Sequence, residues 1–135
     1  LFGEGNYFLE LQDHGIDMQT TVNMELVRMS KELDIPLVCT NDVHYTYEDD
    51  ERPHDILLCL QTGKKLSDED RMRYDGGQYY MKSEAEMAAL FPYVPEALEN
   101  TQKIADRCNV EIEFGVQKLP RFDEPTKEPR QAESS

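Results

Sequence analysis

The sequence has no apolar stretch near the roughly 18 residues that a membrane-spanning helix needs, and no signal-peptide pattern. We therefore expect neither insertion into a membrane nor export. A P-loop, a dinucleotide-binding glycine fingerprint and a serine-histidine-aspartate triad are also missing. Those absences exclude several classes of enzyme at once.

Cysteine is scarce and odd in number, with Cys39, Cys59 and Cys108 widely spaced and each in an apolar context. This pattern favours reduced thiols in the core over a disulfide framework or a zinc knuckle. The expected compartment is the cytoplasm.

Positive charge is scarce: the chain has 14 basic and 28 acidic side chains, which give a net charge of -14. Such a surface repels phosphate backbones and favours divalent cations. We expect no direct nucleic-acid binding by this chain alone, and we interpret the short basic clusters at residues 64–65 and 71–73 as solvated loop.

The 135 residues suffice for one domain with a real core, but not comfortably for two. The chain opens on Leu1 rather than Met, which suggests a piece of a longer protein. Residues 123–135 are polar and are predicted to form a disordered tail.

A strand, a helix and a second strand are predicted in the first 40 residues. Residues 7–12 read as a strand, and residues 37–40 read as a second, fully buried one. Between them, Val22, Leu26, Met29 and Leu33 recur at helical spacing. This order is typical of a right-handed parallel βαβ unit, in which functional groups gather at the C-terminal ends of the strands.

Later residues are predicted to be mainly helical. Helices are expected from about 49 to 62, from 83 to 91 on a Ser-x-x-Glu capping box, and from 95 to 108. The last of these would present Leu98, Thr101, Ile104, Ala105 and Cys108 on one face. Residues 110–114 alternate in polarity and could form a last short strand.

Asp42 and His44 are the candidate metal ligands, two positions apart just past the second strand. A carboxylate and an imidazole suit zinc, manganese or iron. The alternative is that Asp42 caps a turn and His44 is a surface residue.

Three further residues near strand or helix ends are weaker candidates. His14 could be a third ligand, although a turn beside the site is the better interpretation. His54 begins a helix and is expected to be a hydrogen-bonded structural histidine. Glu10 could accept a hydrogen bond from a metal-bound imidazole and so orient its ring.

Five blocks of the sequence stand out when taken together: FGEGNYFLELQDHG (2–15), IPLVCTNDVHY (35–45), HDILLCLQTGK (54–64), YMKS (80–83) and PEALENT (95–101). In family order and spacing, these blocks resemble the alpha subunit of bacterial DNA polymerase III. The region matched is the later part of its N-terminal PHP (polymerase and histidinol phosphatase) domain and the segment that leads toward the palm.

The resemblance implies an α/β fold: the C-terminal part of a distorted PHP (β/α)7 barrel, followed by a mainly helical extension. Residues 1–47 would end the barrel, residues 48–122 would form the extension toward the palm, and residues 123–135 the tail. In the family, the Asp-x-His of the last barrel strand supplies two metal ligands, which correspond here to Asp42 and His44. The remaining PHP ligands would precede this chain, and the palm that holds two magnesium ions would follow it.

The function that the resemblance implies belongs to a longer parent chain. That parent would be a DNA-directed DNA polymerase, with primer-template DNA, the sliding clamp and other replisome subunits as partners. The PHP site would serve 3'-5' exonuclease proofreading or act as a non-catalytic docking scaffold, and the fragment alone would be inactive. A stand-alone PHP phosphoesterase is the alternative, but it should lack the run from His54 to Phe122.

Overall fold

A computed structural model describes residues 2–74, 76–116 and 118–119. Strand β1 (Leu9–Leu11) pairs in parallel with strand β2 (Leu37–Cys39), and helix α1 (Asp17–Leu33) connects them. The predicted βαβ unit is therefore confirmed, with strands shorter than predicted. The tail predicted at residues 123–135 lies outside the described residues.

Local chemistry explains where α1 ends. Asp34 adopts a left-handed conformation with φ 54° and donates its backbone N–H to the carbonyl of Ser30. Pro36 follows two residues later, and proline cannot continue a helix. The chain can then reverse and enter β2 beside β1.

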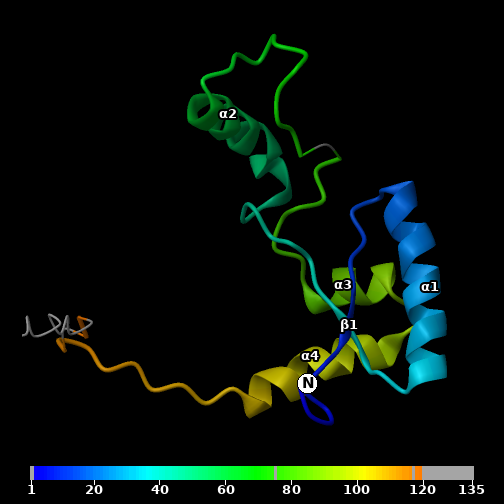
Figure 1. Ribbon diagram of the computed structural model, residues 1–135. Helices are drawn as coiled ribbons and strands as arrows, with labels where there is room; N and C mark the ends of the chain where they lie inside the picture. The colour runs from blue at the N-terminus through cyan, green and yellow to red at the C-terminus, as the bar shows by residue number, and fades with distance from the viewer. Residues whose placement is uncertain (1, 75, 117, 120–135) are drawn as a thin grey trace, which may run out of the picture.

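The other predicted helices are also present. A 3-10 turn, η1 (Glu48–Asp50), leads into α2 (Glu51–Thr62), which ends at left-handed Gly63. Helices α3 (Glu84–Leu90) and α4 (Pro95–Arg107) follow. Figure 1 shows α1 beside β1, α3 and α4 near the strands, and α2 set apart from this body. No helix in the described ranges is long and apolar enough to span a membrane.

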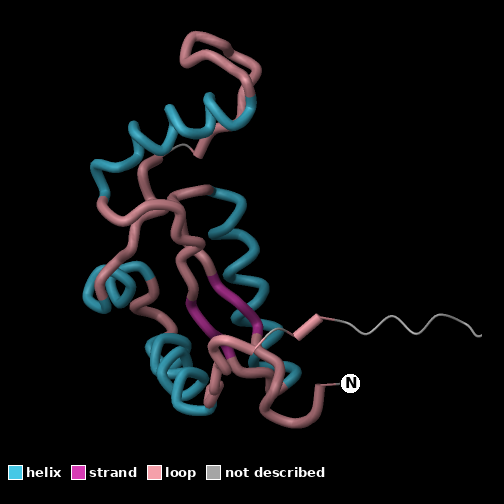
Figure 2. The backbone as a smooth tube through the Cα atoms, turned by 90° about the vertical axis from the view of Figure 1, so that its left-hand side faces the viewer, coloured by secondary structure: helices cyan, strands magenta, loops and turns pink. Residues whose placement is uncertain are grey.

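The core lies on one face of the two strands. Its buried members are Leu9, Leu11, Leu37, Cys39, Phe91, Val94 and Ala97, and partly buried apolar residues of α1, α3 and α4 pack against them. The side-chain amide of Asn100 on α4 donates to the carbonyl of Leu37, 2.8 Å away. Helices from beyond residue 47 therefore complete the core of the βαβ unit, as the flanking helices in Figure 2 indicate. The predicted boundary near residue 47 stays a prediction, but the core crosses it.

Residues 110–114 form no strand, so that prediction was wrong. The apolar side chains of the segment are exposed, with Phe114 at 88%. Alternating polarity yields a strand only where a neighbouring strand accepts the backbone hydrogen bonds, and no such pairing occurs here.

One expectation about buried side chains was also wrong. Cys108 is exposed, whereas Cys39 and Cys59 are buried as predicted. On α1, Val22 and Leu33 are exposed, because the helix meets the core through Leu26, Val27 and Met29. On α4 the buried position is Ala97, whereas Thr101 and Ala105 are exposed.

Candidate functional site

Polar residues meet at the C-terminal ends of β1 and β2, as the parallel pairing predicts. His14 follows β1, and Asp42 and His44 follow β2. The Nε2 atom of His14 lies 3.5 Å from the carbonyl oxygen of Asn41. Two sequence positions 27 residues apart thereby form one site.

Asp42 lies in a left-handed backbone conformation with φ 34°. Asp and Asn tolerate this region better than other non-glycine residues, because their short side chains bond locally. The carboxylate is half-exposed, and its Oδ1 atom is 3.8 Å from Nδ1 of His44. Asp42 is thus accessible beside an imidazole, as a ligand would have to be.

The hydrogen bonding of His44 assigns its tautomer. Its Nδ1 atom lies 2.7 Å from the carbonyl oxygen of Asp42. A carbonyl only accepts hydrogen bonds, so Nδ1 carries the proton and donates it. In the neutral ring Nε2 then keeps its lone pair, which is the arrangement of a metal-ligating histidine.

His14 has the opposite assignment. The side-chain oxygen of Gln19 accepts the backbone N–H of His14 at 2.8 Å, so the Gln19 amide nitrogen is the atom 3.0 Å from Nδ1 of His14. Nδ1 therefore accepts that amide, and Nε2 carries the proton that faces Asn41. Neither nitrogen offers a lone pair, so His14 is a neighbour of the site, the interpretation preferred from the sequence.

All three histidines meet tyrosine rings in one group, which we call the ring cluster. Its members are His14, His44, His54, Tyr45, Tyr74 and Tyr79. Sequence reasoning missed the tyrosines, since nothing local links them to the histidines. His54 is held here by rings, with its centroid 5.3 Å from that of Tyr45.

A segment at residues 78–82 runs beside the loop that carries Asp42 and His44. The carbonyl of Tyr79 accepts the backbone N–H of His44 at 2.8 Å. The Asn41 side chain donates to the carbonyl of Tyr80 and accepts from Nζ of Lys82 at 3.3 Å. Burial lowers the pKa of Lys82. The hydrogen bonds from residues 79–82 therefore fix the loop that carries Asp42 and His44.

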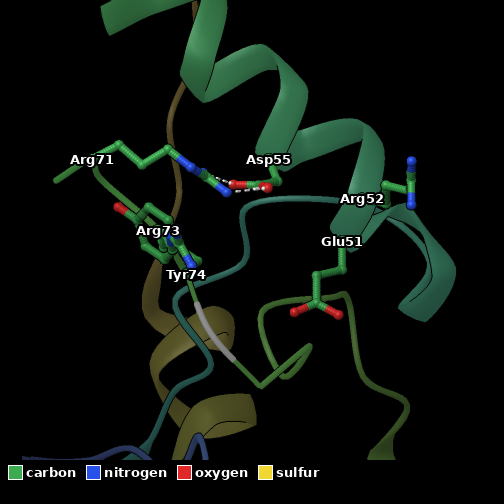
Figure 3. A pocket seen from close by; sticks show the side chains of 6 residues that line it. All are labelled: Glu51, Arg52, Asp55, Arg71, Arg73 and Tyr74. Atoms are coloured by element: carbon green, nitrogen blue, oxygen red, sulfur yellow. Dashed lines mark hydrogen bonds and ion pairs between the residues drawn. The ribbon is translucent and has the colours of Figure 1, made fainter. Parts of the chain in front are cut away.

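A cavity of about 260 Å³ lies next to the ring cluster, with Tyr74 in its lining. Figure 3 shows the side chains that line it. Arg71 reaches across to Asp55 on α2 with two parallel hydrogen bonds, and this guanidinium lowers the pKa of the Asp55 carboxyl. Arg73, Arg52 and Glu51 complete the polar lining. Two carboxylates line the cavity together with the guanidinium groups, so we do not interpret the cavity as an anion site. We interpret the Arg71–Asp55 pair as a contact that holds the Tyr74 segment close to His44.

The donor set for a metal is incomplete within the part of the chain that the structure describes. No group of three or more His, Cys, Asp or Glu side chains there could hold an ion. Glu10, considered as an orienting residue, instead accepts a hydrogen bond from the Thr40 hydroxyl. Asp42 and His44 fit two positions of a coordination sphere, and any others must come from elsewhere.

Comparison with known proteins agrees with the resemblance drawn from the sequence blocks. The DNA polymerase III subunit alpha of Campylobacter jejuni is 42% identical over 117 residues, which are 87% of this chain and 10% of that protein. Those of Treponema pallidum and Borreliella burgdorferi are 46% and 44% identical over 125 and 126 residues, 93% of this chain and 11% of each relative. No protein-family model matches. The chain is thus similar to one segment of these proteins and spans about a tenth of their length.

Proposed function

We propose that this chain is a segment of a bacterial replicative DNA polymerase of the DNA polymerase III alpha type. The support is identity of 42–46% over most of the chain with three such subunits. In this proposal, template-directed DNA synthesis, the two magnesium ions of a palm and the replisome partners belong to the longer protein. The aligned stretches of 117–126 residues exceed the 47 residues assigned to the barrel, which favours a polymerase over a stand-alone PHP phosphoesterase.

Within that protein, we propose that Asp42 and His44 are two ligands of a PHP metal centre that holds zinc, manganese or iron. The observation that carries this is the His44 tautomer. Its Nδ1–H donates to the backbone carbonyl of Asp42, so the lone pair of Nε2 is left to bind a metal. When bound, the metal would act as a Lewis acid toward a phosphodiester, the chemistry of 3'-5' exonuclease proofreading. The chain's own residues hold the ligands in place.

The two faces of the β1–β2 pair support placing it in a barrel. One face is buried under helices, as the outer face of a (β/α) barrel would be. On the strands' other side, Thr40 donates to Glu10 and accepts from the Gln12 amide at 3.1 Å. Polar groups that bond to one another there suit the interior of a barrel near its C-terminal mouth.

A docking scaffold without metal is the second candidate. The two candidates differ in metal content, so one experiment separates them.

The experiment uses the full-length product of the gene that encodes this chain. Its zinc, manganese and iron are measured by mass spectrometry in the wild type and in the variants Asp42→Asn and His44→Ala. We expect stoichiometric metal in the wild type. In both variants the metal affinity should fall by more than the roughly 10–100-fold that follows from removing a residue that only hydrogen-bonds to a ligand. Exonuclease activity should fall in parallel.

Asp34→Asn is the matched control. Asp34 is the other non-glycine residue with positive φ in the described chain, and it lies at the opposite end of β2. It undergoes the same chemical change without touching the site, so its metal content should stay at the wild-type level. A wild-type protein without metal would establish the scaffold instead, and variants that keep the wild-type metal content would exclude Asp42 and His44 as its ligands.

A further inference from the structure

We propose that the ring of Tyr79 is a positioning group for His44, holding the imidazole so that Nδ1 donates to the carbonyl oxygen of Asp42 and Nε2 keeps its lone pair. The significance for metal binding rests on the function proposed above, whereas the effect on the imidazole does not. Tyr79 is 35 residues beyond His44 in the sequence and is assigned no role by the candidate motif.

Tyr79 touches His44 in two independent ways. Its carbonyl fixes the backbone, accepting the N–H groups of His44 at 2.8 Å and Tyr45 at 3.3 Å. Its ring stands edge-on to the imidazole, with centroids 5.6 Å apart and planes at 88°. The first contact survives any substitution of the side chain, so the second can be tested alone.

The ring of Tyr79 is itself held from both sides. His14 stacks on it in parallel, with centroids 4.3 Å apart and an interplanar angle of 10°. Tyr74 meets it edge-on at 5.0 Å and also contacts His44 at 4.2 Å. Since His14 is buried and bound to Gln19 and Tyr79 is buried too, the ring has little room to turn. The Tyr79 ring can therefore act as a rigid packing surface for the partly exposed imidazole of His44.

The contact matters because a 2.7 Å hydrogen bond to Asp42 needs one ring orientation of His44. Without the packing against the Tyr79 ring, the His44 imidazole gains rotamers in which Nδ1 turns away from the Asp42 carbonyl. In those rotamers the two tautomers interconvert. A ligand that must be reordered on binding loses affinity, because the ordering then opposes complex formation.

The first readout is the His44 tautomer, measured by long-range ¹H–¹⁵N spectra of the 135-residue chain, which has only three histidines to assign. Wild type should show a protonated Nδ1 and an unprotonated Nε2. Tyr79→Leu should give averaged ¹⁵N shifts at the two positions, and Tyr79→Phe should retain the wild-type pattern. The second readout is zinc affinity of the full-length product: within about 2-fold for Tyr79→Phe and roughly 10–100-fold weaker for Tyr79→Leu.

Phe91→Leu is the matched control, because Phe91 is a fully buried ring of the core outside the ring cluster. It should lower thermal stability, as Tyr79→Leu does, yet leave both the tautomer and zinc affinity unchanged. A wild-type tautomer in Tyr79→Leu would overturn the positioning role, whatever happens to zinc. Zinc binding that is absent in the wild type would overturn the proposed metal centre, while the tautomer readout would still decide the role of Tyr79.

Discussion

The three thiols of the chain differ in access at the scale of single residues. Cys39 and Cys59 are buried, and Cys108 is exposed just after α4. Burial, with a smaller contribution from Glu96, raises the pKa of Cys39 to about 12, so this thiol stays protonated at neutral pH. Thiol reagents attack the thiolate, and they need access to it.

We therefore predict that one thiol per chain reacts rapidly with Ellman's reagent at pH 7.5, and that it is Cys108. The other two should react only after denaturation. Cys108→Ser should abolish the fast phase while leaving two thiols detectable in denaturant. Rapid modification of Cys39 in the native protein would contradict the burial of β2.

The Arg71–Asp55 pair gives a second prediction at this scale. Asp55→Asn removes the charged partner of a guanidinium whose side chain is only 5% exposed. Hydrogen bonds to charged groups are worth about 1.5–3 kcal/mol, so the free energy of unfolding should fall by that order. Urea denaturation at pH 7 measures it. The control Glu25→Gln breaks an exposed pair with Arg28 and should leave the free energy of unfolding essentially unchanged, because solvent screens such pairs.

The same pair sets a pH dependence. Arg71 lowers the pKa of Asp55 below its ordinary value of 3.8 in the folded state. The stabilisation is therefore fully present above that ordinary value and is lost as the pH falls through the lowered one. Below about pH 4 the wild type and Asp55→Asn should converge in stability, and a constant difference between pH 7 and pH 2 would contradict the assignment.

At the scale of elements, helix α3 begins with a capping box that acts on a carboxyl group. The Ser83 hydroxyl and backbone N–H both donate to Glu86 Oε2, at 2.6 and 2.7 Å, and the Tyr80 hydroxyl donates to Oε1. These hydrogen bonds lower the pKa of Glu86 to about 2, and the bond from the Ser83 side chain makes the largest contribution. The cap is thus present above pH 4.5 and is lost as the pH falls through about 2.

We predict that the Glu86 carboxyl carbon titrates near pH 2 by NMR, and that Ser83→Ala moves the midpoint up toward the ordinary value of 4.5. The substitution should also weaken the helix start by about 1 kcal/mol. Ser67→Ala, in an exposed loop, should leave the midpoint unchanged. A wild-type midpoint near 4.5 would mean that the box does not form in solution.

Elements defined by local chemistry could be predicted from the sequence. The capping box at Ser83 and the helix end at Gly63 each depend on a few neighbouring residues. The pairing of the parallel strands depends on a single helical connection. The strand predicted at residues 110–114 is absent because alternating polarity forms a strand only beside a partner strand. The neighbouring residues of the sequence do not reveal whether such a partner is present. The candidate pair could be picked out because Asp42 and His44 are two positions apart, and its metal role stays a prediction. Tyr79 was missed because its contact with His44 is tertiary.

At the scale of the molecule, helices α3 and α4 complete a core that β1, α1 and β2 leave open. Leu11 and Phe91 are fully buried in the same cluster, although 80 residues separate them. Burying a Phe or a Val side chain contributes roughly 1.5–3 kcal/mol, against a total stability of about 5–15 kcal/mol for a small domain. Removing Phe91 and Val94 together therefore takes away a large part of the net stability.

We predict that a chain ending at residue 82 does not unfold cooperatively, because the apolar face of β1 and β2 loses its cover from α3 and α4. A chain ending at residue 108 keeps both helices and should retain a single thermal transition by circular dichroism, along with dispersed amide resonances. If the 82-residue chain also melted in one sharp transition, residues 1–47 would contain a self-sufficient core and the helices would be an appendage. The buried position of Ala97 against the strands argues for the first outcome, since α4 then belongs to the folding unit that presents Asp42 and His44.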